Sequence, residues 1–434
     1  MNSFFRLKEK GTNYRTEIIA GLTTFLTMVY IVVVNPAILE QAGMDFGAVF
    51  VATVLATALS TLIMGLFANY PIAIAPGMGL NAYFAFSVVG QTGASWEVAM
   101  GAVLVAGLLF LLLSLTRFRE VLIKAIPDSL KYGITAGIGL FIAFIGLKSA
   151  GIIAGDEVNL VGLGDFHQPM TVLSLIGLGV TLALMTLGVR GALFIGMVVT
   201  ALIGWFIGMF PTPEQWISLP PSMAPTFGKA VFALPEVFAQ GLYAAIFSFL
   251  LVTLFDTTGT MIGVAEQAGL LKKGKFPRMR SALLADAVGM SAGAIMGTSP
   301  TSAYVESSSG VASGGRTGLT AVVVSGLFLL TLFFEPVVSA IAAVPAITAP
   351  TLIIVGCFMM SGLAKVKWNE FEEAFPAFIV MLSMPLTFSI ATGIAFGFIT
   401  YPLLKVVRGR YRDVHPLMYL LLVLFVLQLI LMPE

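Results

Sequence analysis

The 434-residue sequence has few of the side chains that build disulfides, metal sites or charged surfaces. It contains one cysteine (Cys357) and two histidines (His167 and His415), and only 10% of its residues are charged. A single cysteine excludes an internal disulfide, and two histidines without cysteine partners argue against a structural metal site. We therefore expect no metal and no other cofactor.

Apolar residues are abundant instead. They make up 58% of the chain, with 34 phenylalanines, more than the core of one soluble domain could bury. Runs such as VAGLLFLLLSL and VVVSGLFLLTLFF recur in segments of about twenty apolar residues, the length that spans a bilayer. This pattern predicts an all-α, multi-pass protein of the cell membrane. We place its spans at 16–36, 46–68, 79–90, 96–115, 129–148, 171–188, 191–210, 237–266, 280–297, 303–313, 315–335 and 347–363.

The C-terminal part is less regular. Residues 374–407 resemble a helix pair broken near Pro385 and Gly393, and 415–432 form a further apolar segment. The expected total is about fourteen helices, with 415–432 either the fourteenth or an additional one.

The distribution of charge predicts the orientation. With the spans in this order, only Lys148 and Lys229 of the 23 basic residues fall in outside loops. Lys and Arg accumulate on the cytoplasmic side of membrane proteins. The charged opening MNSFFRLKEKGTNYRTE accordingly predicts a cytoplasmic N-terminus without a cleaved signal peptide.

The two halves of the chain are related. The sequence EQAG recurs at 40–43 and 266–269, VLVAGLLFLLL from Val103 matches VVVSGLFLLTL from Val322, and Ile126-Pro127 corresponds to Val344-Pro345. The offsets are similar and the order is kept. Because an odd number of spans separates the copies, the second must be inserted upside down, as in the inverted repeats of secondary transporters.

Two corresponding spans are interrupted. PIAIAPGMGLNAYFAFSVVG (71–90) and MGTSPTSAYVESSSGVASGG (296–315) each contain a proline followed by too few residues for a full crossing. Extended backbone is tolerated at that depth only where protein or a polar cavity satisfies it. We expect a short extended segment and a half-helix in each, with the half-helix N-termini facing one another near the midplane.

Two acidic residues are expected deep within the membrane rather than near its interfaces. A buried charge in a membrane indicates function by default, which singles out Glu306 and Asp256. Asp256 could instead be a structural carboxylate that Thr253, Thr257, Thr258 and Thr260 satisfy. Glu306 could be a helix-end residue capped by its serines, and Asn81 a turn or cap residue.

Other polar residues receive structural interpretations. We expect Asp286 and Glu335 near membrane interfaces, Arg316 in a cytoplasmic turn, and Glu372 and Glu373 in a solvated loop. The glycines of TAGIGLFIAFIG (135–146) are expected to permit close helix packing. The sequence contains no nucleotide-binding loop, catalytic triad or DDxxD motif, so an intramembrane enzyme is disfavoured.

Three strings carry a family resemblance. APGMGLNAYF (75–84), LFDTTGTMIGVAEQAG (254–269) and GTSPTSAYVESSSGVASGGRTGLTA (297–321) resemble the nucleobase/cation symporter-2 family, and more closely its azaguanine-like purine permease branch. The resemblance implies fourteen helices in two inverted seven-helix repeats, and proton-coupled uptake of a purine base, often by a homodimer. It also implies a core domain at 1–118 and 233–343 and a gate domain at 119–232 and 344–434.

The same resemblance assigns ligand-binding roles to Asn81, Asp256 and Glu306. Some members of the branch carry a second Asp three residues before the position of Asp256, where this chain has Thr253. The coupling proton is therefore assigned to Asp256 or Glu306 without a choice between them.

Together these observations predict the import of a neutral purine, with hypoxanthine and guanine favoured. Glu306 would accept its N–H groups, Asn81 would add a donor and an acceptor, and the backbone N–H groups of Ala303, Tyr304, Val305 and Glu306 would meet its carbonyl or ring nitrogens. The expected partners are the base, the proton and the lipid bilayer, and not nucleic acid. An adenine-preferring permease and an anion exchanger of the same fold are the alternatives, although Glu306 would repel an anion.

Overall fold

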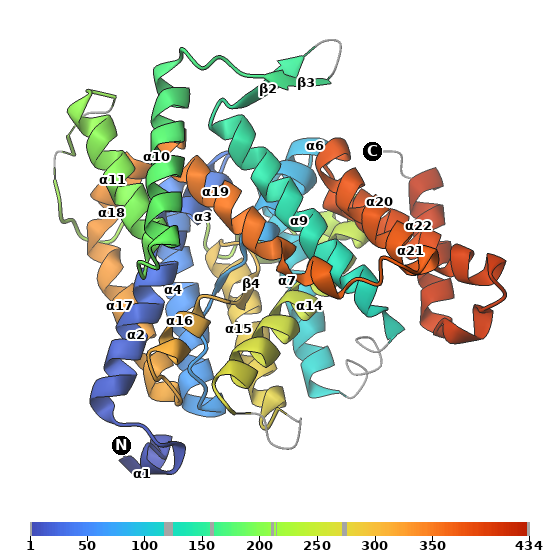
Figure 1. Cartoon of the computed structure of the whole chain (residues 1–434), viewed down its shortest axis with the longest axis horizontal. Coiled ribbons are helices and arrows are strands. Elements are labelled where there is room, and N and C mark those ends of the chain that lie inside the picture. Colours follow the sequence, from blue (N-terminus) through green and yellow to red (C-terminus); the bar gives the residue numbers. More distant parts are fainter. Residues whose placement is uncertain are drawn as a thin grey trace.

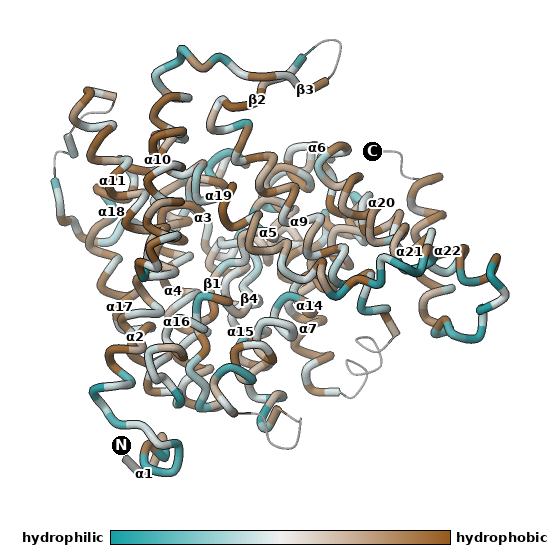
Figure 2. Tube along the Cα trace, viewed as in Figure 1, coloured by the Kyte–Doolittle hydropathy of each residue, from teal (hydrophilic) through white to brown (hydrophobic). Residues whose placement is uncertain are grey.

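The computed structural model of the chain describes residues 2–116, 125–156, 160–209, 212–213, 215–270 and 276–431. Within these ranges, nine helical segments are long and apolar enough to cross a membrane. Hydrophobic residues follow outer helices such as α10 and α11, and hydrophilic residues gather in segments at the top and bottom of the view and in the loop before α22 (Figure 2). This distribution confirms the multi-pass, mostly helical fold.

The elements of the first half begin with a short helix, α1, and end with two short helices that lead into the second half. They are α1 (Asn2–Phe5), α2 (Tyr14–Met28), α3 (Ile31–Glu40), α4 (Phe46–Ile63), β1 (Ile74–Pro76), α5 (Met78–Ala82), η3 (Tyr83–Val89), α6 (Gly90–Thr92), α7 (Trp96–Leu115), α9 (Asp128–Ser149), β2 (Ile153–Asp156), β3 (Leu160–Leu163), α10 (Pro169–Thr186), α11 (Ala192–Phe206), α12 (Lys229–Phe232) and α13 (Leu234–Ala239).

The second half repeats the same kinds of element. It contains α14 (Tyr243–Gln267), α15 (Met279–Met296), β4 (Thr301–Ala303), α16 (Ser307–Ala312), α17 (Gly318–Thr331), α18 (Glu335–Ala342), α19 (Pro345–Met359), η5 (Met360–Lys365), α20 (Phe371–Thr387), α21 (Ile390–Val407) and α22 (Pro416–Leu431).

The two interrupted spans meet in the middle of the molecule. Strands β1 and β4 pair antiparallel, with Ile74 opposite Ala303 and Pro76 opposite Thr301 (Figures 1 and 2). Each strand is followed by a short helix, α5 or α16, whose N-terminus lies beside the pair. The antiparallel direction matches the inversion of the repeats and confirms the predicted extended segments.

Side chains satisfy the outer edges of this strand pair. The Thr61 hydroxyl exchanges hydrogen bonds with the N–H and carbonyl of Ile74, and the Thr257 hydroxyl accepts the N–H of Ala303. Lipid offers no hydrogen bonds, so exposed backbone groups at this depth need protein partners. Threonines on α4 and α14 therefore allow two extended strands inside a helical membrane protein.

The first span is also interrupted. Helices α2 and α3 are separated at Val29 and Tyr30, where the N–H groups of Val32 and Val33 bond to carbonyls three residues earlier. The surrounding sequence VYIVVV is rich in β-branched residues, which fit a helix less well than straight side chains. The break places Tyr30 next to the second interrupted span, as described below.

The helices pack in two groups. The core group contains α2, α3, α4, α5, α7, α14, α15, α16 and α17 with both central strands, and the gate group contains α9, α10, α11, α19, α20 and α21. Helix α22 packs on α21, and its Phe425 contacts Phe398 of α21 and Phe247 of α14. The residue boundaries given above for the core and gate domains remain a prediction.

Glycines bring the gate helices together. A Cβ on Gly139 of α9 would lie 2.7 Å from the carbonyl oxygen of Gly356 of α19, and a Cβ on Gly356 would lie 2.4 Å from the carbonyl oxygen of Gly139. Neither distance is tolerated, so the two backbones can touch only because both residues are glycine. This contact confirms the packing role predicted for the glycines of 135–146.

The connector after α9 contains a hairpin, β2 with β3. The expectation for the acidic pair at 372 and 373 needs correction. Glu372 and Glu373 lie in the first turn of α20 and are buried, because Lys405, Arg408 and Arg410 pair with them. The solvated loop predicted for this acidic pair is therefore wrong.

Candidate functional site

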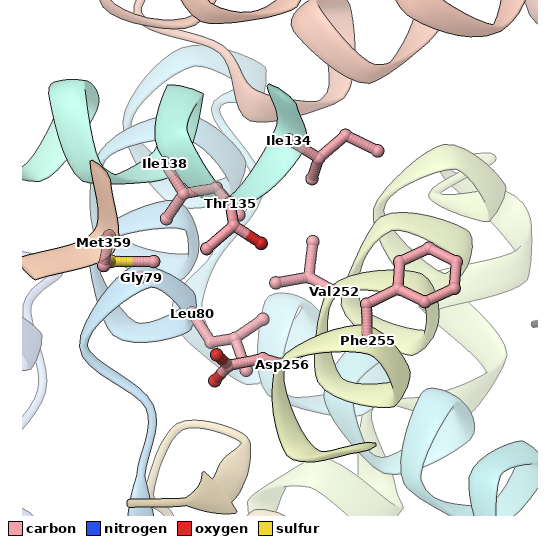
Figure 3. Close-up of a pocket in the computed structure, with 9 residues that line it drawn as sticks. All are labelled: Gly79, Leu80, Ile134, Thr135, Ile138, Val252, Phe255, Asp256 and Met359. Carbon is pink, nitrogen blue, oxygen red and sulfur yellow. The ribbon is translucent and has the colours of Figure 1, made fainter. Parts of the chain in front are cut away.

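A small cavity lies between the core and gate groups. Its volume is about 20 Å³, and its wall comes from α5, α9, α14 and α19 (Figure 3). The lining residues are Gly79, Leu80, Ile134, Thr135, Ile138, Val252, Phe255, Asp256 and Met359. This space holds about one water molecule, whereas organic ligands occupy pockets of hundreds of Å³. A ligand of heterocycle size therefore requires the two groups to separate.

Asp256 lines this cavity from α14. It is half-buried, and the Ser302 side chain of β4 hydrogen-bonds to its carboxylate. The structural alternative, in which the neighbouring threonines satisfy Asp256, is not supported for three of them. Thr257 donates to Asp286, while the buried hydroxyls of Thr253 and Thr258 have no hydrogen-bond partner in the described part of the chain.

Glu306 lies at the start of α16, directly before Ser307. It is half-buried, and the Tyr30 hydroxyl donates to its Oε1 at 2.6 Å. The Thr27 hydroxyl approaches the Glu306 carbonyl at 3.5 Å. The break in the first span thus holds Glu306, which is not among the residues that line the 20 Å³ cavity.

The backbone around Glu306 is partly occupied. The N–H of Ala303 bonds to Thr257 and that of Tyr304 bonds to the Ala73 carbonyl at 3.0 Å. The Tyr304 hydroxyl donates to the carbonyl of Pro76 at 2.6 Å, so this side chain ties β4 to β1. Of the four predicted backbone donors, the N–H of Glu306 bonds to the carboxylate of the same residue. Only that of Val305 lacks a partner among the described residues, and the Val305 side chain is 53% exposed.

Asn81 belongs to a buried amide network. Its Nδ2 donates to Oδ1 of Asn35 at 3.1 Å, and Asn35 Oδ1 also accepts the Ser299 hydroxyl at 2.9 Å. Asn35 Nδ2 donates to the hydroxyls of Thr53 and Thr298 at 2.7 and 2.9 Å. The Asn35 side chain of α3 therefore joins α5, which follows β1, to the residues just before β4. Asn81 Oδ1 has no partner among the described residues.

Asp286 was expected near a membrane interface, but it lies in the interior, beside the central strand β4. It is fully buried on α15, and its carboxylate accepts the hydroxyls of Thr257 at 2.5 Å and Thr301 at 2.9 Å. It thus connects α14, α15 and β4. Asp286 does not line the cavity and contacts it only through other residues, which makes it a positioning residue rather than a ligand-binding one.

The sequence analysis did not identify Tyr30 or Asn35 as residues of the site, and it did not predict that Asp286 is buried beside β4. Asn35 had a usable signal, because an amide inside the apolar run IVVVNPAIL is costly in lipid and indicates a specific partner. Tyr30 had none, since its partner Glu306 lies 276 residues further along the chain. Among the described residues no group of three or more His, Cys, Asp or Glu is placed to hold a metal ion.

Comparisons with known proteins agree with this architecture. The sequence profile described as the permease family matches residues 15–396. The guanine/hypoxanthine permease PbuO of Bacillus subtilis (strain 168) is 58% identical over 428 residues, covering 98% of this chain and 99% of that protein. The adenine permease AdeP of Escherichia coli (strain K12) is 48% identical over 427 residues, covering 98% and 95%.

Among solved structures, the transmembrane domain of the cyanobacterium bicarbonate transporter BicA aligns with a TM-score of 0.65, covering 88% of this chain and 97% of that one. At 15% identity this similarity shows the fold alone, which is two inverted repeats of seven helices. The chain therefore belongs to the permease family, within the nucleobase/cation symporters that it resembles, and is a multi-pass transporter of the cell membrane rather than an enzyme.

Proposed function

We propose that this transporter imports purine nucleobases, hypoxanthine and guanine in preference to adenine, by proton symport. The observation that carries the proposal is the Asp256 carboxylate, which faces the cavity between core and gate. The higher identity to a guanine/hypoxanthine permease, 58% against 48% for an adenine permease, supports the order of preference.

The proposed site uses the core group. Asp256 and Glu306 accept N–H groups of the neutral base. The N–H groups of Val305 and Glu306 meet its acceptors, that of Glu306 in exchange for its bond to its own carboxylate. Ala303 and Tyr304 shape the strand that carries these groups. Asn81 contributes its unpaired Oδ1, which needs a donor. A base with the wrong donor pattern would leave such buried groups unpaired, at a cost of about 1–3 kcal/mol each.

Proton coupling is assigned to the same two carboxylates. Asp256 or Glu306 takes up a proton from outside with the base and releases it inside. Buried acids within a membrane protein are suited to this role, because a change of charge there alters which conformation is favoured. Alternating access follows from movement of the gate domain (119–232 and 344–434) against the core domain (1–118 and 233–343), in a protein that we propose to be a homodimer.

The test is uptake of radiolabelled hypoxanthine by cells that lack their own purine carriers. Asp256→Asn and Glu306→Gln keep the shape of each side chain and should lower uptake at least tenfold at equal abundance in the membrane. Asp165→Asn, in an exposed loop, is the matched control and should transport normally. A wild-type protein that transports none of hypoxanthine, guanine and adenine would sink the proposal.

Symport has its own measurement. In proteoliposomes, an inward proton gradient should drive accumulation of hypoxanthine, and a protonophore should abolish it. Accumulation that ignores the proton gradient and follows a sodium gradient instead would contradict proton coupling while leaving purine transport intact.

Competition distinguishes the remaining alternatives. Stronger inhibition of hypoxanthine uptake by adenine than by guanine would favour an adenine permease. Because the fold is shared with a bicarbonate transporter, an anion exchanger is the other alternative. The carboxylates of Asp256 and Glu306, however, would repel an anion. Bicarbonate exchange in the absence of purine uptake would establish that alternative.

A further inference from the structure

The cavity wall contains two polar side chains, one from the core group of helices and one from the gate group. Among its lining residues only Asp256 and Thr135 have polar side chains; Asp256 comes from the core helix α14 and Thr135 from the gate helix α9. The rest of the gate side is apolar and includes Ile134, Ile138 and Met359. Thr135 is therefore the single polar side chain that the gate presents to this space.

The Thr135 hydroxyl is placed to reach a ligand. It points from α9 toward the space bordered by α5 and α14 (Figure 3). Its present partner is the carbonyl of Lys131, at 3.2 Å within the same helix. This is longer than the usual 2.5–3.0 Å between hydroxyl and carbonyl oxygens. The bond is easily exchanged, and the oxygen keeps its lone pairs for an incoming donor.

We propose that Thr135 is a substrate-binding residue of the gate, which hydrogen-bonds the nucleobase on the edge opposite Asp256. This inference rests on the proposed function. A purine has donors and acceptors around its whole perimeter, so an edge pressed against Ile134, Ile138 and Met359 alone would leave polar atoms unpaired. Thr135 removes that penalty, and it can do so only when gate and core close on the base.

The role therefore goes beyond holding the ligand. Core groups can bind the base in an open carrier, whereas the bond to Thr135 forms as the gate approaches. A base that bonds to Thr135 favours closure, whereas a base that cannot do so presents its own polar edge to the apolar residues of the gate and leaves that edge unpaired. Thr135 thus contributes to substrate selection at the closing step.

The experiment compares Thr135→Val, which keeps the shape but removes the hydroxyl, with Thr135→Ser, which keeps the hydroxyl. Concentration-dependent uptake of hypoxanthine, guanine and adenine is measured at equal membrane abundance. The valine protein should show a KM roughly three- to tenfold higher, the effect of one hydrogen bond, and the serine protein a KM near wild type.

A matched control lies on another gate helix. Thr181 of α10 is buried and donates to the carbonyl four residues earlier, at 2.7 Å, but does not line the cavity. Thr181→Val should leave KM unchanged. If Thr135→Val does not reach the membrane, Thr135→Ala against Thr135→Ser gives the same comparison.

The outcomes separate cleanly. A higher KM for all three bases supports a contact with the imidazole edge that they share, and a higher KM for only some supports a contact with the six-membered ring. A wild-type KM in both hydroxyl-free proteins, or a fall in maximal rate alone, overturns the role of Thr135. Absence of purine uptake in the wild type would instead refute the proposed function itself.

Discussion

The Thr257 hydroxyl donates to the Asp286 carboxylate across 2.5 Å and accepts the N–H of Ala303 at 3.2 Å. One hydroxyl on α14 therefore connects a buried acid on α15 to the strand that leads into Glu306. Thr301 of the same strand binds the same carboxylate at 2.9 Å. Asp286 fixes the position of β4 without touching the cavity.

Removal of this carboxylate should destabilise the protein. In Asp286→Ala the hydroxyls of Thr257 and Thr301 lose a buried acceptor, which we expect to cost about 2–4 kcal/mol in unfolding free energy. Asp286→Asn keeps one acceptor oxygen and should cost less. The measurement is the thermal unfolding midpoint of the detergent-purified protein.

Asp165→Ala is the control for that series, because Asp165 lies in an exposed loop and bonds only to neighbouring residues of that loop. Its midpoint should equal that of the wild type. If Asp286→Ala unfolds at the wild-type temperature, the carboxylate does not hold β4.

Tyr30 should influence transport more than stability. Tyr30→Phe keeps the buried ring and removes only the hydroxyl that binds Glu306 Oε1 at 2.6 Å. Without that donor the Glu306 carboxylate is no longer oriented, so we expect a KM for hypoxanthine roughly three- to tenfold higher. The midpoint of thermal unfolding should change little.

Tyr419→Phe provides the comparison, since the Tyr419 hydroxyl bonds to the carbonyl of Tyr411 at 2.9 Å in an exposed turn. It should not alter uptake. Equal KM values for Tyr30→Phe and wild type would show that Glu306 keeps its orientation without the tyrosine.

Much of this architecture could be predicted from the sequence because it depends on local patterns. Apolar length gives the spans, and the prolines before Asn81 and Glu306 give the two interruptions, which pair through β1 and β4. The glycines of α9 predict close helix packing, and the structure shows that the partner is α19. Inverted pairing follows from the repeat, because the copies enter from opposite sides.

The remaining contacts depend on how the helices are rotated. The apolar spans carry no strongly polar face, so hydropathy does not indicate whether Asp286 faces lipid, an interface or β4. Likewise, nothing near Tyr30 indicates a partner 276 residues away. Glu373 appeared solvated because its partner Lys405 lies on the next helix and becomes visible only when α20 and α21 pack.

Asn35 should be essential for stability. Its amide forms four hydrogen bonds, to Thr53, Asn81, Thr298 and Ser299. Asn35→Ala leaves the Asn81 amide and the Ser299 hydroxyl without this partner, although Thr53 and Thr298 still contact each other at 3.2 Å. We expect a loss of at least about 3 kcal/mol, measured as a lower unfolding midpoint.

A second asparagine calibrates this effect. Asn13 caps α2 by accepting the N–H of Thr16 at 3.0 Å in an exposed position. Replacing such a cap by alanine costs about 1 kcal/mol. A shift for Asn35→Ala no larger than that for Asn13→Ala would mean that the buried network adds nothing beyond an ordinary cap.

The buried ion pair between α20 and α21 should contribute to stability mainly because each charge neutralises the other. Lys405 Nζ lies 2.8 Å from Glu373 Oε1, and both side chains are almost fully buried. Lys405→Met removes the cation and, within the described part of the chain, leaves the Glu373 carboxylate with only the Tyr401 hydroxyl, at 3.1 Å. We expect destabilisation by about 3 kcal/mol, because an unpaired buried charge is costly.

The double variant Lys405→Met/Glu373→Gln should recover most of that loss, since neutral groups need no counter-ion. The pair of Arg6 and Glu9, 3.9 Å apart with both side chains exposed, is the control, and its removal should cost less than about 1 kcal/mol. In 1 M salt the control effect should vanish, because charges are then screened beyond about 3 Å, whereas the buried pair should keep its effect. A double variant no more stable than Lys405→Met would show that the lost stability comes from packing of the lysine stem rather than from the unpaired charge.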